Sequence, residues 1–122
     1  MIKEIAFNAY PAKDVRALRE WYSTTLGLKF GNPFEQDGVV MYDEAEIGSN
    51  GWFSLMSHEW MEVAAGSASG IAFEVDDIEK TKADLSAMGI DVPDIYDTPV
   101  CRVVSIKDAE GNKVTFHEHK EF

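Results

Sequence analysis

The sequence has little cysteine, little positive charge and no long hydrophobic run, and each scarcity excludes a class of protein. A single cysteine among 122 residues cannot form a disulfide within the chain, which fits a reducing compartment. The 11 basic residues face 22 acidic ones, and the net charge of -11 opposes binding to a polyphosphate backbone. No apolar run approaches the roughly 20 residues that a membrane-spanning helix needs. We therefore expect a cytoplasmic protein that binds neither nucleic acid nor a membrane.

The remaining composition is typical of one globular domain. Hydrophobic residues make up 45% of the chain, and a chain of this length buries roughly two thirds of its unfolded surface without needing disulfides. Acidic residues outnumber basic ones in both halves, so neither half is a separate charged module. We predict a single domain over residues 1–122.

Two copies of the triplet Ile-Ala-Phe, at residues 5–7 and 71–73, indicate an internal repeat. Each triplet lies in a short β-rich run, over residues 5–10 and 71–75, that predicts a half-buried strand. A segment with apolar residues at helical spacing follows each run. The chain is therefore interpreted as two related modules.

Helix boundaries are marked by residues with capping chemistry. Asp14 opens the first helical pattern and Gly27 ends it, because an aspartate side chain caps free amides and glycine adopts the left-handed turn. In the second module, Asp76 or Asp77 opens the helix and Gly89 ends it. The two helices are expected to be equivalent within one position.

Three further β-rich runs follow each helix, so each module is predicted to be βαβββ. Module 1 covers about 1–60 and module 2 about 69–122, with a short Ala-, Ser- and Gly-rich connector at 62–70. We expect an α+β fold in which the paired modules form a mixed sheet with the helices outside it. The predicted strands cover residues 28–34, 39–43, 52–57, 90–96, 100–106 and 113–118.

Paired βαβββ modules in so short a chain resemble the vicinal oxygen chelate superfamily, which includes glyoxalase I, bleomycin-resistance proteins and extradiol dioxygenases. The resemblance spans essentially the whole chain and implies a cup-shaped sheet and a homodimer, because relatives with this fold commonly pair. The modules pair either within one chain or across that dimer. The motifs that carry it are Asp14-Val15, Trp21-Tyr22 and Leu26-Gly27-Leu28, and later Asp108-Ala109-Glu110-Gly111-Asn112 with Val114-Thr115-Phe116-His117.

In metal-using members, the resemblance implies, the first and last strands of each module each supply one ligand. Counting from the triplets and the closing strands, these positions hold Glu4, Ser54, Gly70 and Thr115. Glycine has no side-chain donor, and hydroxyls are weak donors beside imidazole and carboxylate. We expect no metal and no other cofactor at this place.

Strand alternation predicts a cavity that binds a small organic molecule. Residues two apart on a strand share a face, so one wall of the cavity carries Glu4 and Asn8. The opposing walls carry an aromatic ring, a thioether, two hydroxyls and an imidazole. Such a lining suits a ligand with some apolar surface. The predicted cavity residues are Glu4, Asn8, Trp52, Ser54, Met56, Thr115 and His117.

The sequence leaves an enzymatic alternative open. A lyase, isomerase or dioxygenase could use a relocated divalent metal, for which His117 and His119 share a strand face, or metal-free acid-base chemistry through Glu4 and His117. Cys101 and Arg102 are expected to point to opposite faces of one strand. Acidic residues at 43, 44 and 46 are expected to face solvent.

Overall fold

The computed structural model describes residues 1–49 and 51–121 and divides into two compact units. Unit 1 comprises Met1–Ala68 together with Asp108–Asn112, and unit 2 comprises Ser69–Lys107 and the residues from Lys113 on. Each unit contains one four-stranded mixed sheet with helical cover. The predicted α+β class and the βαβββ order of each module are thereby confirmed.

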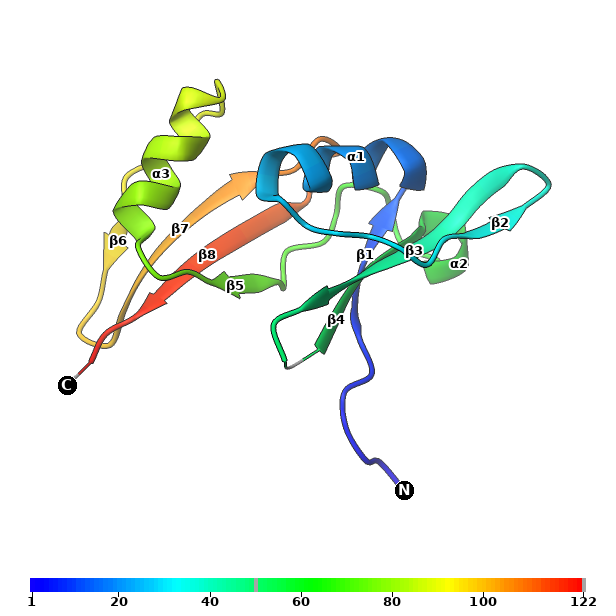
Figure 1. Cartoon of the computed structure of the whole chain (residues 1–122), viewed down its shortest axis with the longest axis horizontal. Coiled ribbons are helices and arrows are strands. Elements are labelled where there is room, and N and C mark those ends of the chain that lie inside the picture. Colours follow the sequence, from blue (N-terminus) through cyan, green and yellow to red (C-terminus); the bar gives the residue numbers. More distant parts are fainter. Residues whose placement is uncertain (50, 122) are drawn as a thin grey trace. The chain divides into compact units, whose positions relative to one another are not determined.

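Unit 1 forms a sheet in the order β1-β4-β3-β2 (Figure 1). β1 runs parallel to β4, and the other neighbours are antiparallel. A four-residue helix that the sequence pattern did not predict follows the last strand. The elements are β1 (Asn8–Ala12), α1 (Val15–Leu26), β2 (Phe34–Gln36), β3 (Val39–Ile47), β4 (Gly51–Ser57) and α2 (His58–Met61).

The caps of α1 are those that the sequence predicts. The Asp14 side chain accepts a hydrogen bond from the Ala17 amide at 3.0 Å, and Gly27 has a φ of 72°, where other residues are strained. A buried stripe of Val15, Leu18 and Tyr22 faces the sheet. The helix therefore covers one face of unit 1.

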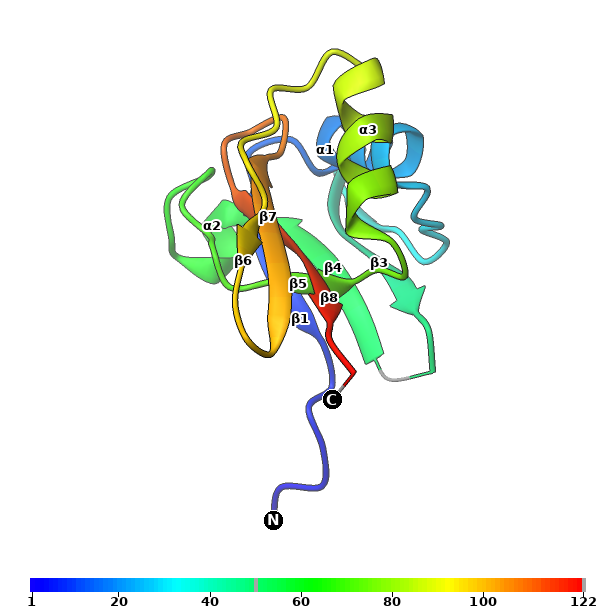
Figure 2. The same cartoon turned by 90° about the vertical axis from the view of Figure 1, so that its left-hand side faces the viewer.

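Unit 2 repeats this topology with the order β5-β8-β7-β6 (Figure 2). Asp77, rather than Asp76, caps its helix by accepting from the Lys80 amide at 3.1 Å, and Ile78 and Leu85 are buried. The elements are β5 (Ala72–Glu74), α3 (Ile78–Ala87), β6 (Tyr96–Asp97), β7 (Cys101–Lys107) and β8 (Lys113–His119).

The first strand after each helix is shorter than predicted. β2 starts at Phe34 instead of residue 28, and β6 has two residues, because most of each segment does not pair with the sheet. The Asp37-Gly38 turn has φ values of 53° and 79°, which match the twist of the hairpin between β2 and β3. The turn expected at 48–51 includes Asn50, which lies outside the described residues.

The repeated triplets are not structurally equivalent. Ala9 pairs with Ser54 in unit 1, and Ala72 pairs with Thr115 in unit 2. Ala72 therefore matches Ala9 and not Ala6, so the first triplet lies three residues too early. Residues 1–7 precede β1 and belong to no strand or helix (Figure 1).

The loop Asp108–Asn112, between β7 and β8, belongs to unit 1 through a buried polar cluster. The Tyr22 hydroxyl donates to Asp108 at 2.7 Å, and the Asn112 side-chain amide donates to the same carboxylate at 2.9 Å. Burial and then the Asp108 charge raise the pKa of the Tyr22 hydroxyl far above its usual 10.0. Tyr22 thus stays a neutral donor.

We predict that Tyr22→Phe lowers the free energy of unfolding by about 1–2 kcal/mol, because Asp108 loses one buried donor. Urea unfolding followed by circular dichroism measures the change. Tyr96→Phe is the matched control, since Tyr96 is 69% exposed and its variant should stay within about 0.5 kcal/mol of the wild type. Equal losses in both variants would contradict the role of the cluster.

Candidate functional site

The face of each sheet that points away from its own helix, called the far face, carries the polar groups of interest. In unit 1, Phe53 packs against Tyr22 of α1 with ring centroids 5.1 Å apart, so Phe53 and Leu55 lie on the helix face. By strand alternation Trp52, Ser54 and Met56 lie on the far face, as the sequence predicts.

A hydrogen-bonded triad lies at the centre of the far face of unit 1. The Tyr42 hydroxyl contacts the Glu44 carboxylate at 2.6 Å and the Ser54 hydroxyl at 2.8 Å. Its single hydrogen goes to the carboxylate acceptor, so Ser54 donates to the Tyr42 oxygen. Burial, and next the bond to Glu44, raise the pKa of Tyr42. Tyr42 was not among the predicted site residues, and Glu44 was expected to face solvent. Alternation along β3 from Glu44, the partner of Ser54, places both on this face.

Aromatic side chains surround this triad. Phe7 meets Tyr42 edge to face with centroids 6.0 Å apart, and Trp52 is 39% exposed. Phe34, which pairs with Tyr42 across the sheet, stacks at a tilt on Trp60 of α2 at 5.7 Å. The far face of unit 1 therefore combines exposed rings with a small polar centre.

Two predicted cavity residues do not join this group. Asn8 is in register with Phe53, which puts it on the helix face of the sheet instead of beside Ser54. Glu4 lies before β1 and is exposed. The cause is the late start of β1, which brings Ala9 next to Ser54.

One of the four positions implied for a metal changes for the same reason, and the resulting set does not fit a divalent ion. The structural match of Gly70 is Phe7, two residues before Ala9, and not Glu4. Phenylalanine and glycine provide no donor, and Ser54 and Thr115 provide hydroxyls. Within residues 1–49 and 51–121 no group of three or more His, Cys, Asp or Glu side chains is placed to hold a metal ion.

The far face of unit 2 places both of its predicted residues in hydrogen-bonded pairs. Thr115 and Ser105 hydroxyls are 2.8 Å apart, and the His117 Nδ1 atom lies 2.5 Å from a Glu74 carboxylate oxygen. The other Glu74 oxygen accepts from the His119 backbone amide at 2.8 Å. The acid beside His117 is therefore Glu74, which was not among the predicted site residues, and not Glu4.

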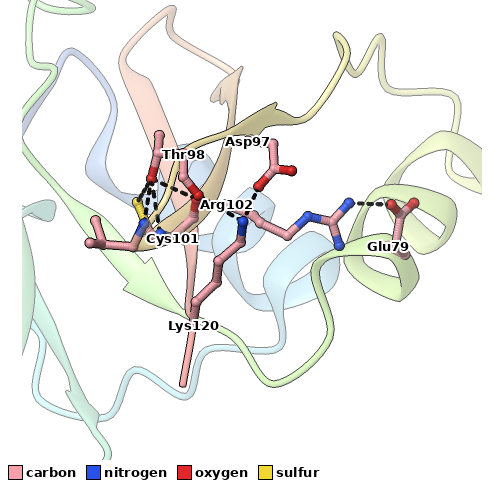
Figure 3. A network of polar contacts seen from close by, with 7 residues as sticks. Glu79, Asp97, Thr98, Cys101, Arg102 and Lys120 are labelled. Carbon is pink, nitrogen blue, oxygen red and sulfur yellow. Dashed lines mark hydrogen bonds and ion pairs between the residues drawn. The ribbon is translucent and has the colours of Figure 1, made fainter. Parts of the chain in front are cut away.

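Other polar groups of unit 2 support its edges (Figure 3). Arg102 reaches Glu79 of α3 at 2.5 Å, whereas Cys101 contacts the Thr98 hydroxyl at 3.2 Å. Arg102 thus points to the helix face of β7, and Cys101 points to the opposite face, as expected. The Lys120 ammonium lies 2.5 Å from an Asp97 carboxylate oxygen and donates to the Thr98 carbonyl at 2.7 Å.

The expectation that Asp43 faces solvent is wrong. Its side chain is fully buried on the helix face of unit 1, where Arg19 of α1 donates to it at 2.9 Å and the Asn32 amide donates at 2.9 Å. A buried carboxylate needs such partners, and the segment before β2 is held by them. Asp43 therefore has a structural role.

A groove of about 890 Å³ lies elsewhere in unit 1, around the start of α1 and the β2–β3 turn. Its wall includes Asp14, Arg16, Asp37, Val39, Ser57 and Glu59. None of the predicted cavity residues lines it.

The chain belongs to the Glyoxalase/Bleomycin resistance protein/Dioxygenase superfamily, whose family model matches residues 4–116. Among solved structures, TnmS3, an antibiotic binding protein from Streptomyces sp. CB03234, is 20% identical with a TM-score of 0.84, and the match covers 98% of each chain. A superfamily member from Sphaerobacter thermophilus DSM 20745 is 20% identical with a TM-score of 0.83, over 98% of this chain and 99% of that one.

A further similar structure is lactoylglutathione lyase from Agrobacterium tumefaciens, which is 21% identical with a TM-score of 0.77, over 96% of this chain and 94% of that one. These likenesses establish the fold. No curated protein matches the sequence. Among the described residues no helix is long and apolar enough to cross a bilayer.

We predict that the Glu74 carboxyl titrates below its ordinary pKa of 4.5, because it accepts the His119 amide first and His117 second. Its contribution to stability is present above pH 4.5 and is lost as the pH falls through the lowered folded value. Carbon-detected NMR titration measures the value. In His117→Ala it should rise toward 4.5 but stay below it, since the backbone bond remains; an unchanged titration would contradict the pairing.

Proposed function

We propose that the protein binds a small organic molecule on the far face of unit 1. One observation carries this proposal: the Tyr42–Glu44–Ser54 triad lies among exposed aromatic rings on one sheet face. Apolar surface supplies the affinity of such sites, and a few fixed polar groups supply the orientation. Trp52 and Met56 flank the triad along β4.

The triad favours a ligand that combines a flat apolar part with a hydrogen-bond donor. Glu44 is acceptor-only when ionised, and one of its oxygens is committed to Tyr42 at 2.6 Å. A ligand hydroxyl or amine can donate to the other oxygen while a ring packs on Trp52 or Phe7. The similar structure of TnmS3, an antibiotic binding protein, supports small-molecule binding as a use of this fold.

The enzymatic alternative has one specific observation in its favour. Glu74 and His117 form a carboxylate–imidazole pair on the far face of unit 2. This pair replaces Glu4 and His117 as the candidate for metal-free acid-base chemistry.

The homodimer and the cytoplasmic location stay predictions.

We predict that Trp52→Ala weakens ligand binding by about 10-fold or more, because a large aromatic contact is worth a few kcal/mol when buried. A library of fluorinated aromatic amines and phenols, screened by fluorine NMR against the wild type, supplies the probe. Trp21→Ala is the matched control, since Trp21 lies on α1 against Tyr22. Its effect should appear in unfolding and not in affinity.

Amide NMR spectra of the bound wild type locate the probe. Shifts confined to Trp52, Ser54 and their neighbours support the proposal. If no library member binds, or if Trp21→Ala weakens binding as much as Trp52→Ala does, the far face of unit 1 is not the site.

We also predict that binding needs no divalent ion, because Phe7, Ser54, Gly70 and Thr115 are a poor donor set. Dialysis against EDTA should leave the affinity for the same probe unchanged. Elemental analysis of protein purified without chelator should find less than about 0.1 equivalents of Zn, Ni, Fe or Mn. One equivalent, or loss of binding in EDTA, would contradict this prediction.

A further inference from the structure

On the far face of unit 2, the His117 ring is held by a contact to one of its two nitrogens. Nδ1 lies 2.5 Å from a Glu74 oxygen, and no hydrogen bond joins Nε2 to another described residue. A carboxylate beside Nδ1 selects the tautomer that carries its hydrogen there. Nε2 is then the basic nitrogen, and the side chain is 32% exposed.

Glu74 is itself held so that it can support a positive imidazolium ring. Its second oxygen accepts from the His119 backbone amide at 2.8 Å, and these contacts keep the carboxyl ionised by lowering its pKa. An ionised carboxylate stabilises the charge that appears when Nε2 takes a proton. Glu74 is thus a positioning residue for His117.

A hydroxyl pair lies next to this dyad on the same face. Thr115 and Ser105 are 2.8 Å apart, so one donates and the other keeps its hydrogen for another partner. Thr115 and His117 are two positions apart on β8, which is about 7 Å along a strand. A small molecule spanning that distance can meet both groups.

The scaffold does not require this dyad. Pro11 and Met56 occupy the equivalent paired positions of unit 1, and the strands pair there in the same way. The polar pair of unit 2 therefore adds chemistry that the shared fold can form without.

We propose that Glu74 and His117 form a proton-accepting dyad for a small carbon or oxygen acid. This activity deepens the acid-base alternative given under the proposed function and is independent of the binding proposed for unit 1. In the step, the C–H or O–H bond of the substrate breaks and the proton binds Nε2 of His117. The electron pair stays on the substrate as an oxyanion or enolate-type anion, which accepts a hydrogen bond from the Thr115–Ser105 pair. Return of a proton from Nε2 regenerates the neutral ring.

Nitroethane tests this proposal, because it is a slowly ionising carbon acid whose anion places charge on oxygen. In heavy water, proton NMR follows the exchange of its methylene hydrogens for deuterium. We expect the wild-type protein to accelerate exchange over buffer. His117→Gln keeps a donor for Glu74 but lacks the base, so it should lose on the order of 10-fold or more of that acceleration.

Two further variants separate chemistry from folding. His58→Gln, in α2 of unit 1, is the matched control and should keep the wild-type acceleration. Glu74→Gln should slow exchange several-fold, and nitrogen NMR should show a change in the tautomer of the His117 ring, because the carboxylate beside Nδ1 is lost. Amide spectra verify the fold of each variant.

The proposal is overturned if the wild type exchanges nitroethane no faster than buffer. It is also overturned if His58→Gln loses as much acceleration as His117→Gln, or if Glu74→Gln matches the wild type in both exchange and ring tautomer. Because the Trp52 experiment concerns unit 1 and binding, its result stands apart from this one.

Discussion

Asp108 accepts hydrogen bonds from the Tyr22 hydroxyl, the Asn112 side chain and the amides of Glu110 and Asn112, although it is only 6% exposed. A carboxylate taken out of water needs this many donors. The bonds hold the loop Asp108–Asn112 against α1 within unit 1.

The connector packs on the same loop. Gly66 has a φ of 78°, and a side chain there would collide with the Glu110 carbonyl, so this position requires glycine. Asn112 also accepts from the Ala68 amide at 3.0 Å, and the Glu110 carboxylate accepts from the Lys13 and Asp14 amides at the start of α1. The sequence motif that indicated the family is thus explained by the packing of unit 1.

Local signals predicted the parts of the fold that depend on neighbouring residues. The caps at Asp14 and Gly27 and the Asp37-Gly38 turn act over a few positions, and the structure confirms them. The start of β1 depends instead on which residue meets Ser54 across the sheet, and the repeated triplet gave the wrong answer. This displacement of three residues explains why Glu4 and Asn8 do not lie beside Ser54, as had been predicted.

Pairing between residues far apart in the chain also explains why some residues of the site were not predicted. Glu74 and His117 are 43 positions apart, and Arg19 and Asp43 are 24 apart, so no local pattern joins them. Tyr42 and Glu44 were within reach of sequence reasoning, because antiparallel register places them beside Met56 and Ser54. Charge alone had suggested a solvated edge there, whereas burial and pairing decide the outcome.

Pairing also determines how the two far faces can meet a ligand. Among the described residues no buried side-chain nitrogen or oxygen lacks a hydrogen-bond partner, so the Tyr42 triad is satisfied by the protein itself. A ligand gains little net energy by replacing such bonds, and its affinity for unit 1 must come from the aromatic surface. The second unit differs, because His117 uses one nitrogen for Glu74 and is partly exposed. The two units share one scaffold. Unit 1 has the apolar pair Pro11 and Met56 at the positions where unit 2 has the acid Glu74 and the base His117.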